Sequence, residues 1–350
     1  MRAATRAVQR PPDARLLVVS AGGALRHVAR AALAEALRPG DLLVANDAAT
    51  IPASLAGVHV PTLAPIEIRL AGRRSLAAAD VREWVALVFG EGDHRTRTED
   101  RPPPPPLRPG DTLRLGPLRA RVIRLLGHQR LVSIRFAGSP EVIWEGIARH
   151  GRPIQYAHLA EPLAMWDVWT RLAALPAAFE PPSAGFVVDW GMLARLSARG
   201  VGFATLTHAA GISSTGDPAL DARLPLDEPY LIPAATARAV AKTKASGGRV
   251  VALGTTVTRA LEGAALRDGT VRVGAGLATG RIGRGTRLRV VDAIVTGAHE
   301  PTDSHYELLR AFAGDVVLAR ATAELERRGY RTHEFGDSLL LERSQVPRMK

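Results

Sequence analysis

The chain has 350 residues, of which 46% are hydrophobic and 23% are charged, an ordinary soluble composition with room for two domains. It has no cysteine, which excludes disulfides, thiolate catalysis and thiolate-bound zinc, and no apolar run approaches the roughly 20 residues of a membrane span. The net charge of +12 is typical of nucleic-acid-binding proteins, although a codon bias toward arginine accounts for it equally well. The amino terminus lacks the apolar segment of a secretory signal, so we expect a cytoplasmic protein without membrane contact.

The amino-terminal part alternates strands and helices. Residues 14–20 predict a strand, residues 25–40 a helix with its apolar side chains on one face, and residues 41–47 a second strand. The second strand ends in two polar residues, Asn46 and Asp47. This order of elements is typical of an α/β domain.

The pattern changes between residues 57 and 155. Residues 111–138 contain short β-rich runs that glycine and proline interrupt, as in small antiparallel barrels. We therefore predict a barrel-like domain of residues 57–155 that is inserted into the first domain.

The alternation returns in the second half of the chain. We expect helices at 189–200, 233–248 and most of 304–329, and strands at 201–208, directly before Gly254, at 289–299 and at 337–342. Residues 1–56 and 156–350 together predict an α/β catalytic domain with a mostly parallel sheet that is covered on both faces.

Polar residues follow four of the predicted strands. They are Asn46 with Asp47, Thr207 with His208, Thr255 with Thr256, and Thr296 with His299. In open α/β sheets, ligands bind beyond the carboxyl ends of the strands, so we expect these residues to line one crevice.

The turn from Gly254 to Thr256 joins a buried strand to a helix that carries Arg259 and Glu262. Backbone N–H groups are free at the start of a helix, so the turn predicts a site for a carboxylate or a phosphate. Helix capping alone accounts for one of the two threonines. An ion pair on the helix surface accounts equally well for Arg259 and Glu262.

Two further patterns predict no cofactor or metal site. The glycine-rich segment 274–285 lacks the spacing of a dinucleotide-binding loop and is expected to be a loop. His299, Asp303 and His305 lie close together in the sequence, but they suit a helix start better than a set of metal ligands.

Several collinear motifs resemble the S-adenosylmethionine:tRNA ribosyltransferase-isomerase family of queuosine biosynthesis. The motifs occupy residues 38–55, 151–156, 182–186, 205–211, 249–262, 290–304, 311–314 and 335–341. The resemblance implies an α/β domain with an inserted β-barrel. It also implies that the ribosyl part of S-adenosylmethionine, used as a co-substrate without a permanently bound cofactor, is transferred to a 7-aminomethyl-7-deazaguanine in tRNA to give epoxyqueuosine.

The resemblance also implies roles for particular residues. His208 is the candidate base or acid, and His299 is a donor or a second proton carrier. Thr255, Thr256 and Arg259 would hold anionic groups of the substrate. The full set of expected substrate-binding residues is Asn46, Asp47, Ser183, Gly185, Gly254, Thr255, Thr256, Arg259 and Glu262.

The sequence departs from the family pattern at several motif positions. Ala49 and Ser54 replace two arginines, Val187 replaces a histidine, and the family's His-Ser-Glu becomes Leu226-Asp227-Glu228. These changes predict a divergent paralogue whose binding to tRNA is weakened. Two alternatives follow: an S-adenosylmethionine-using enzyme with a different, non-RNA acceptor, and a non-catalytic RNA-binding relative.

Overall fold

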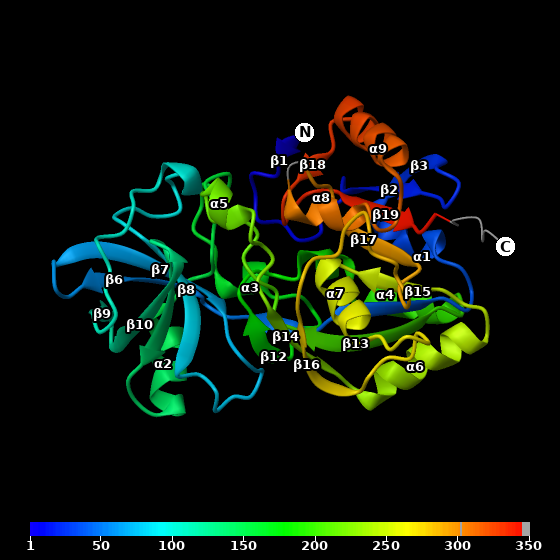
Figure 1. Ribbon diagram of the computed structural model, residues 1–350. Helices are drawn as coiled ribbons and strands as arrows, with labels where there is room; N and C mark the ends of the chain where they lie inside the picture. Colours follow the sequence, from blue (N-terminus) through cyan, green and yellow to red (C-terminus); the bar gives the residue numbers. More distant parts are fainter. Residues whose placement is uncertain (302, 345–350) are drawn as a thin grey trace.

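The computed structural model describes residues 1–301 and 303–344 and has two parts, a large sheet with helices and a separate β-barrel (Figure 1). The sheet has nine strands in the order β16-β14-β13-β4-β15-β17-β19-β2-β3. Its strands are β2 Arg15–Val19, β3 Leu25–Ala29, β4 Leu42–Asn46, β13 Gly202–His208, β14 Glu228–Ile232, β15 Val250–Leu253, β16 Gly274–Ala278, β17 Ala293–Gly297 and β19 Ser338–Glu342.

The predicted α/β class with a barrel is confirmed, and the sheet itself is mixed. The central strands β13, β4, β15 and β17 run parallel, as do β19 and β2. Antiparallel pairings join β17 to β19, β2 to β3, β13 to β14, and β14 to β16. The parallel centre places four carboxyl ends at one edge of the sheet.

Helices cover both faces of the sheet, as the sequence predicts. Along β2, Leu17 and Val19 pack toward α6, α7, α8 and α9, whereas Leu16 and Val18 pack toward α1 and α4. This alternation follows from the two-residue period of a strand. The helices are α1 Leu33–Ala36, α4 Trp190–Ala198, α6 Ala234–Ala245, α7 Thr255–Ala264, α8 Ser304–Leu309 and α9 Asp315–Arg327.

Six antiparallel strands close the barrel in the order β10-β11-β8-β7-β6-β9. They are β6 Ser54–His59, β7 Ala64–Gly72, β8 Glu83–Phe89, β9 Thr112–Leu115, β10 Leu118–His128 and β11 Leu131–Phe136, and helix α2 Pro140–His150 packs on them. The predicted strands within 111–138 are therefore confirmed. The domain boundaries at residues 56 and 155 stay a prediction.

Short elements complete the structure. Strand β1 Arg2–Ala3 pairs with β18 Arg331–Thr332, β5 Ala48–Thr50 pairs with β12 Leu175–Ala178, and the helices α3 Met165–Val168 and α5 Pro218–Asp221 lie between the two parts in Figure 1. Single 3-10 turns occupy Arg30–Ala32, Thr98–Asp100 and Ser183–Val187. No helix in the described ranges is long and apolar enough to cross a membrane.

Two predicted elements are wrong. Residues 25–40 do not form one helix, because Leu25–Ala29 pair with β2 in an antiparallel hairpin whose turn contains Gly23 with a φ of 79°. The segment 274–285 is not all loop, because β16 pairs with β14. There Gly276 lies under the ring of Tyr230, where a Cβ would come within 2.3 Å of ring atoms.

Candidate active site

A cavity of about 220 Å³ lies at the carboxyl ends of β15 and β17. Gly254, Thr255 and Thr256 line it directly after β15, and His299 lines it just beyond β17. Ser183 reaches it from a 3-10 turn. The structure thus brings together these five residues from the set expected from the sequence. Arg259, a sixth member of that set, lines the cavity as well.

One wall of the cavity is the start of helix α7. Gly254 is the N-cap with a φ of 104°, a left-handed conformation that favours glycine. Because the N-cap is glycine, neither Thr255 nor Thr256 caps the helix, and the capping interpretation is wrong. The first-turn N–H groups are left without a side-chain cap on a surface that lines the cavity, which suits an anionic group.

Asn46 and Asp47 lie beneath the cavity and do not line it. The Asn46 side chain donates to the carbonyl of His208 at 2.9 Å and to the Thr256 hydroxyl at 3.3 Å, and it accepts from the His208 N–H at 3.0 Å. Asp47 accepts from the Thr207 hydroxyl at 2.6 Å. Both residues therefore fix the strand ends that carry the cavity wall.

Glu228 is a buried carboxyl group on the cavity wall. Its Oε2 accepts from the Arg259 guanidinium, and its Oε1 accepts from the Gly211 N–H at 2.8 Å. Burial raises the pKa of Glu228 to about 7, although Arg259 acts in the opposite direction. A carboxyl group with this pKa exchanges a proton near neutral pH.

The predicted base, His208, lies behind Glu228. Its side chain is fully buried, and its Nε2 is 3.4 Å from Glu228 Oε2. Burial lowers the pKa of His208 well below its usual value, and the positive charge of Arg259 acts in the same direction. The imidazole is therefore neutral and is not among the residues that line the cavity, so the structure supports a positioning role beside Glu228 in place of direct contact with substrate.

Both terminal nitrogens of the Arg259 guanidinium donate hydrogen bonds within the protein, and the side chain also lines the cavity. Besides Glu228, it donates to the carbonyl oxygens of Leu226, Ala278 and Gly280 at 3.0–3.3 Å. These bonds give the guanidinium a structural role, and its contact with a substrate anion stays a prediction. The alternative ion pair with Glu262 is not formed.

Glu262 and Gly185 have structural roles away from the cavity. The Glu262 carboxylate accepts from the N–H groups of Arg289, Val290 and Val291 at 2.8–2.9 Å, which fixes the segment before β17. A Cβ on Gly185 would lie 3.2 Å from the Thr170 methyl group, so this position serves close packing. Neither residue is among those that line the cavity, and their contacts with substrate stay predictions.

His299 is the second histidine of the site; it is half-buried and lines the cavity. Its Nε2 is 2.8 Å from the Thr296 hydroxyl, and its ring stacks on His305 with 5.0 Å between the centroids. Burial lowers the pKa of His299 well below its usual value, and His305 and His333 add to the effect. A neutral imidazole here offers one hydrogen-bond donor and one acceptor.

Sequence reasoning missed the carboxyl groups of the cavity. Glu180 accepts from the Tyr156 hydroxyl and from the Ser213 N–H, and burial raises its pKa to about 7, with the charge of Glu334 acting in the same direction. No motif marked Glu180, which lies in the loop after β12. A signal did exist for Glu228, because it keeps the glutamate of the family's His-Ser-Glu motif.

The fold and the cavity define a class of protein before any comparison. An α/β sheet binds its ligand beyond the carboxyl ends of parallel strands, and here that edge carries a helix start and two carboxyl groups that titrate near neutral pH. These are the features of an enzyme site for a small polar substrate.

The chain belongs to the S-adenosylmethionine:tRNA ribosyltransferase-isomerase family of queuosine biosynthesis. The family model described as "Queuosine biosynthesis protein" matches residues 1–341. The enzyme of this name from Bradyrhizobium sp. strain BTAi1 is 34% identical over 96% of this chain and 92% of its own length. The one from Anaeromyxobacter dehalogenans strain 2CP-C is 36% identical over 95% and 93%.

A solved structure agrees with this assignment. The crystal structure of S-adenosylmethionine tRNA ribosyltransferase from Thermotoga maritima is 25% identical in sequence and matches with a TM-score of 0.51. The match covers 97% of this chain and 95% of that one. The family resemblance predicted from the motifs is therefore confirmed over nearly the whole chain.

Proposed function

We propose that this protein transfers the ribosyl group of S-adenosylmethionine to the aminomethyl group of a 7-deazaguanine in tRNA and isomerises it to the epoxycyclopentane of epoxyqueuosine, with release of methionine and adenine. Full-length family membership is one support. The observation that supports roles for particular residues is the cavity, because the start of α7, Glu228 and His299 all line it.

The reaction requires three kinds of group, and the cavity offers each of them. A base must remove a proton beside the sulfonium, and we assign this role to Glu228, whose pKa is about 7. The methionyl carboxylate fits the first turn of α7 beside Thr256. The neutral imidazole of His299 is placed to hydrogen-bond the departing adenine.

The charge of the cavity supports cationic substrates. Glu180 and Glu228 both line it. The sulfonium of S-adenosylmethionine and the ammonium of the aminomethyl acceptor are both positive, and carboxylates in a partly buried site favour such charges. The same wall disfavours a phosphate group inside the cavity, so the tRNA backbone must bind elsewhere.

Thr256→Val should weaken S-adenosylmethionine binding about tenfold, because the ligand loses one hydroxyl partner at the start of α7 while the volume of the side chain is retained. The measurement is the rise in melting temperature with S-adenosylmethionine concentration, since a ligand of the native state stabilises it by mass action. Thr243→Val on α6, outside the cavity, is the matched control and should bind as the wild type does. Equal affinity in both variants would remove Thr256 from the binding site.

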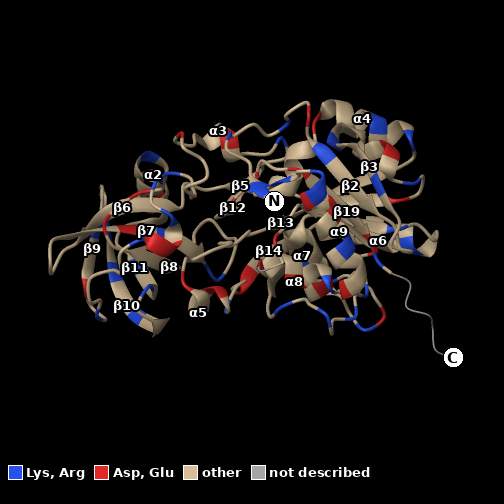
Figure 2. Cartoon of the chain, turned by 90° about the horizontal axis from the view of Figure 1, so that it is seen from above, with Lys and Arg blue, Asp and Glu red and all other residues tan. Residues whose placement is uncertain are grey.

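The outer face of the barrel carries an arginine row that fits a polyanion. Figure 2 shows Lys and Arg segments in blue among the strands of the barrel. Arg114 on β9 is directly opposite Arg119 on β10, and Arg121 on β10 is directly opposite Arg135 on β11. All four are exposed, and of these only Arg135 pairs with a carboxylate, that of Glu83. Like charges directly opposite one another are unfavourable in a sheet, and RNA phosphates between them would relieve the repulsion.

Arg119→Gln combined with Arg121→Gln should lower tRNA affinity and reduce the slope of log K against log salt by roughly 1.5, the value for two lost phosphate contacts. Filter binding at several salt concentrations measures both quantities. Arg238→Gln with Arg320→Gln, on α6 and α9, removes the same charge elsewhere and should change the slope little. If the two double variants behave alike, the barrel face is not the RNA surface.

The weaker binding of tRNA that Ala49 and Ser54 predict stays a prediction.

A further inference from the structure

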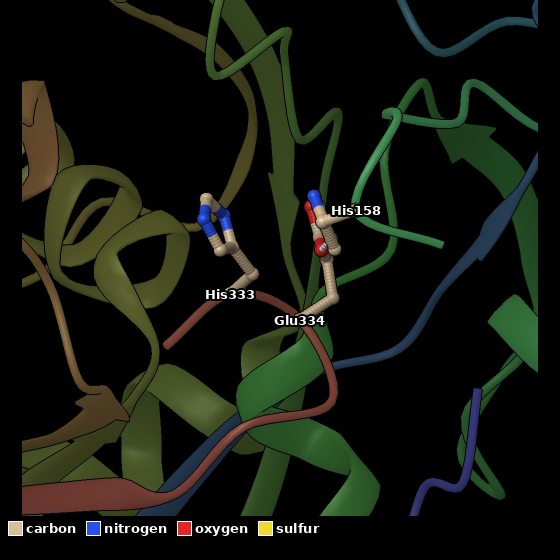
Figure 3. Close-up of side chains that lie close together, drawn as sticks. All are labelled: His158, His333 and Glu334. Atoms are coloured by element: carbon tan, nitrogen blue, oxygen red, sulfur yellow. Dashed lines mark ion pairs between the residues drawn. The ribbon is translucent and has the colours of Figure 1, made fainter. Parts of the chain in front are cut away.

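Three side chains from distant parts of the sequence meet at the mouth of the cavity. His158 lies in the segment between α2 and α3, and His333 and Glu334 lie in the loop between β18 and β19 (Figure 3). Their nearest ligand atoms all lie within 4.8 Å of one another. His333 and Glu334 also line the cavity, so the cluster and the site described above share a boundary.

Two of these side chains each have a buried polar atom that makes no hydrogen bond in the described part of the chain. His158 Nε2 and Glu334 Oε2 are buried and make no hydrogen bond within the described residues, although they lie 3.3 Å apart. Buried polar atoms are nearly always satisfied in native proteins. An ion pair between a protonated His158 and Glu334 would satisfy them in part, and so would a cation held between them.

The geometry also fits a metal ion. Two atoms that each bind a tetrahedral Zn²⁺ at about 2.0–2.1 Å lie about 3.3 Å apart, which is the separation of His158 Nε2 and Glu334 Oε2. The His333 ring stacks on His158 with 4.3 Å between the centroids, and it is exposed, so rotation about its side-chain bonds can turn a nitrogen toward the same point. Two imidazoles and one carboxylate suit a divalent transition metal.

The backbone adds an independent observation. His333 has a φ of 67°, in the left-handed region that residues other than glycine rarely adopt. Such conformations persist only where the surroundings impose them, and they concentrate at functional sites. Here the conformation holds the His333 ring beside His158 at the cavity mouth.

We propose that His158, His333 and Glu334 form a binding site for a divalent transition metal, with Zn²⁺ as the representative ion. The ion would have a fourth coordination position open toward the cavity, and it would tie the segment that leaves the barrel to the loop before β19. This goes beyond the proposed function and departs from the sequence, which predicted no metal. The separation of the ligands in the chain left no spacing signal.

Titration of the untagged, metal-free full chain with Co²⁺ tests this proposal. We expect one equivalent to bind with the visible absorption of tetrahedral Co²⁺, and Zn²⁺ to displace it and raise the melting temperature. His158→Gln, His333→Gln and Glu334→Gln should each weaken binding at least about tenfold.

A second histidine–glutamate pair provides the matched control. His27 Nε2 lies 2.8 Å from Glu324 Oε1 without a second histidine, so His27→Gln should leave Co²⁺ binding unchanged. The absence of a Co²⁺ spectrum at submillimolar metal would overturn the proposal and leave His158 and Glu334 as an ion pair. Binding that survives all three ligand variants would overturn it as well. Neither result depends on ribosyl transfer, so this test is separate from that of the proposed function.

Discussion

Glu228→Gln should lower the rate of ribosyl transfer by about 10²–10⁴-fold, the usual contribution of a general base, while the affinity for S-adenosylmethionine stays within a few fold of wild type. Glutamine keeps the size of the side chain and can still accept from the Gly211 N–H, but it cannot take up a proton. Single-turnover rates with saturating S-adenosylmethionine and substrate tRNA measure the effect.

Glu262→Gln is the control for this prediction. The sequence placed Glu262 in the site, whereas the structure places its carboxylate on backbone N–H groups outside the cavity. We therefore expect Glu262→Gln to lower the melting temperature and to leave the transfer rate of the folded protein near wild type. A Glu228→Gln enzyme that turns over normally would contradict the assignment of the base.

Arg259→Met should lower the free energy of unfolding by about 3–5 kcal/mol at pH 8, the cost of leaving a buried charge without its partner. Arg259 is the only cation that contacts Glu228 among the described residues, because the other basic residue beside this carboxyl group, His208, is neutral. Urea unfolding of the variant and the wild type measures the difference. The double variant with Glu228→Gln should recover part of the loss, because no carboxylate then remains to be paired.

The loss in Arg259→Met should also depend on pH. The folded pKa of Glu228, about 7, is above the ordinary value of 4.5, so the folded state binds more protons between these values and the contribution of Glu228 to stability falls as the pH rises through this window. At pH 5 the carboxyl group is protonated in the folded state, and the variant should lose less than at pH 8. The exposed Arg238→Met should cost within about 0.5 kcal/mol at both values. Equal losses at pH 5 and pH 8 would contradict the pairing.

The strands and helices of the sheet domain could be predicted where the local apolar pattern matches the element that forms in the fold. The strand before Gly254 and the helix after it are read from apolar spacing and a glycine, and both are present as β15 and α7. The prediction for residues 25–40 was wrong because a 3.6-residue apolar pattern competes with a hairpin, and backbone pairing of Leu25–Ala29 with the preceding strand β2 decided the outcome. A pairing partner in another segment leaves no trace in a local pattern.

The site could be predicted only in part for the same reason. The strand-end pattern predicted that Thr255, Thr256 and His299 lie together, and all three line the cavity. The direction of a parallel strand fixes which of its ends faces the ligand. That Glu228 lies in front of His208 depends on the antiparallel register of β14 against β13, which aligns His208 with Tyr230. No spacing in the sequence encodes this register.

The central claim is that this cavity performs ribosyl transfer to tRNA, and one measurement tests it most directly. The full-length protein is incubated with S-adenosylmethionine and with tRNA that contains 7-aminomethyl-7-deazaguanine, and adenine, methionine and the modified nucleoside are quantified by mass spectrometry. We predict adenine and methionine in equal amounts, both matched by epoxyqueuosine and both absent without the tRNA. Adenine and methionine released without any change in the tRNA would indicate another acceptor, and no release at all from protein that binds both substrates would show that the chain is a non-catalytic relative.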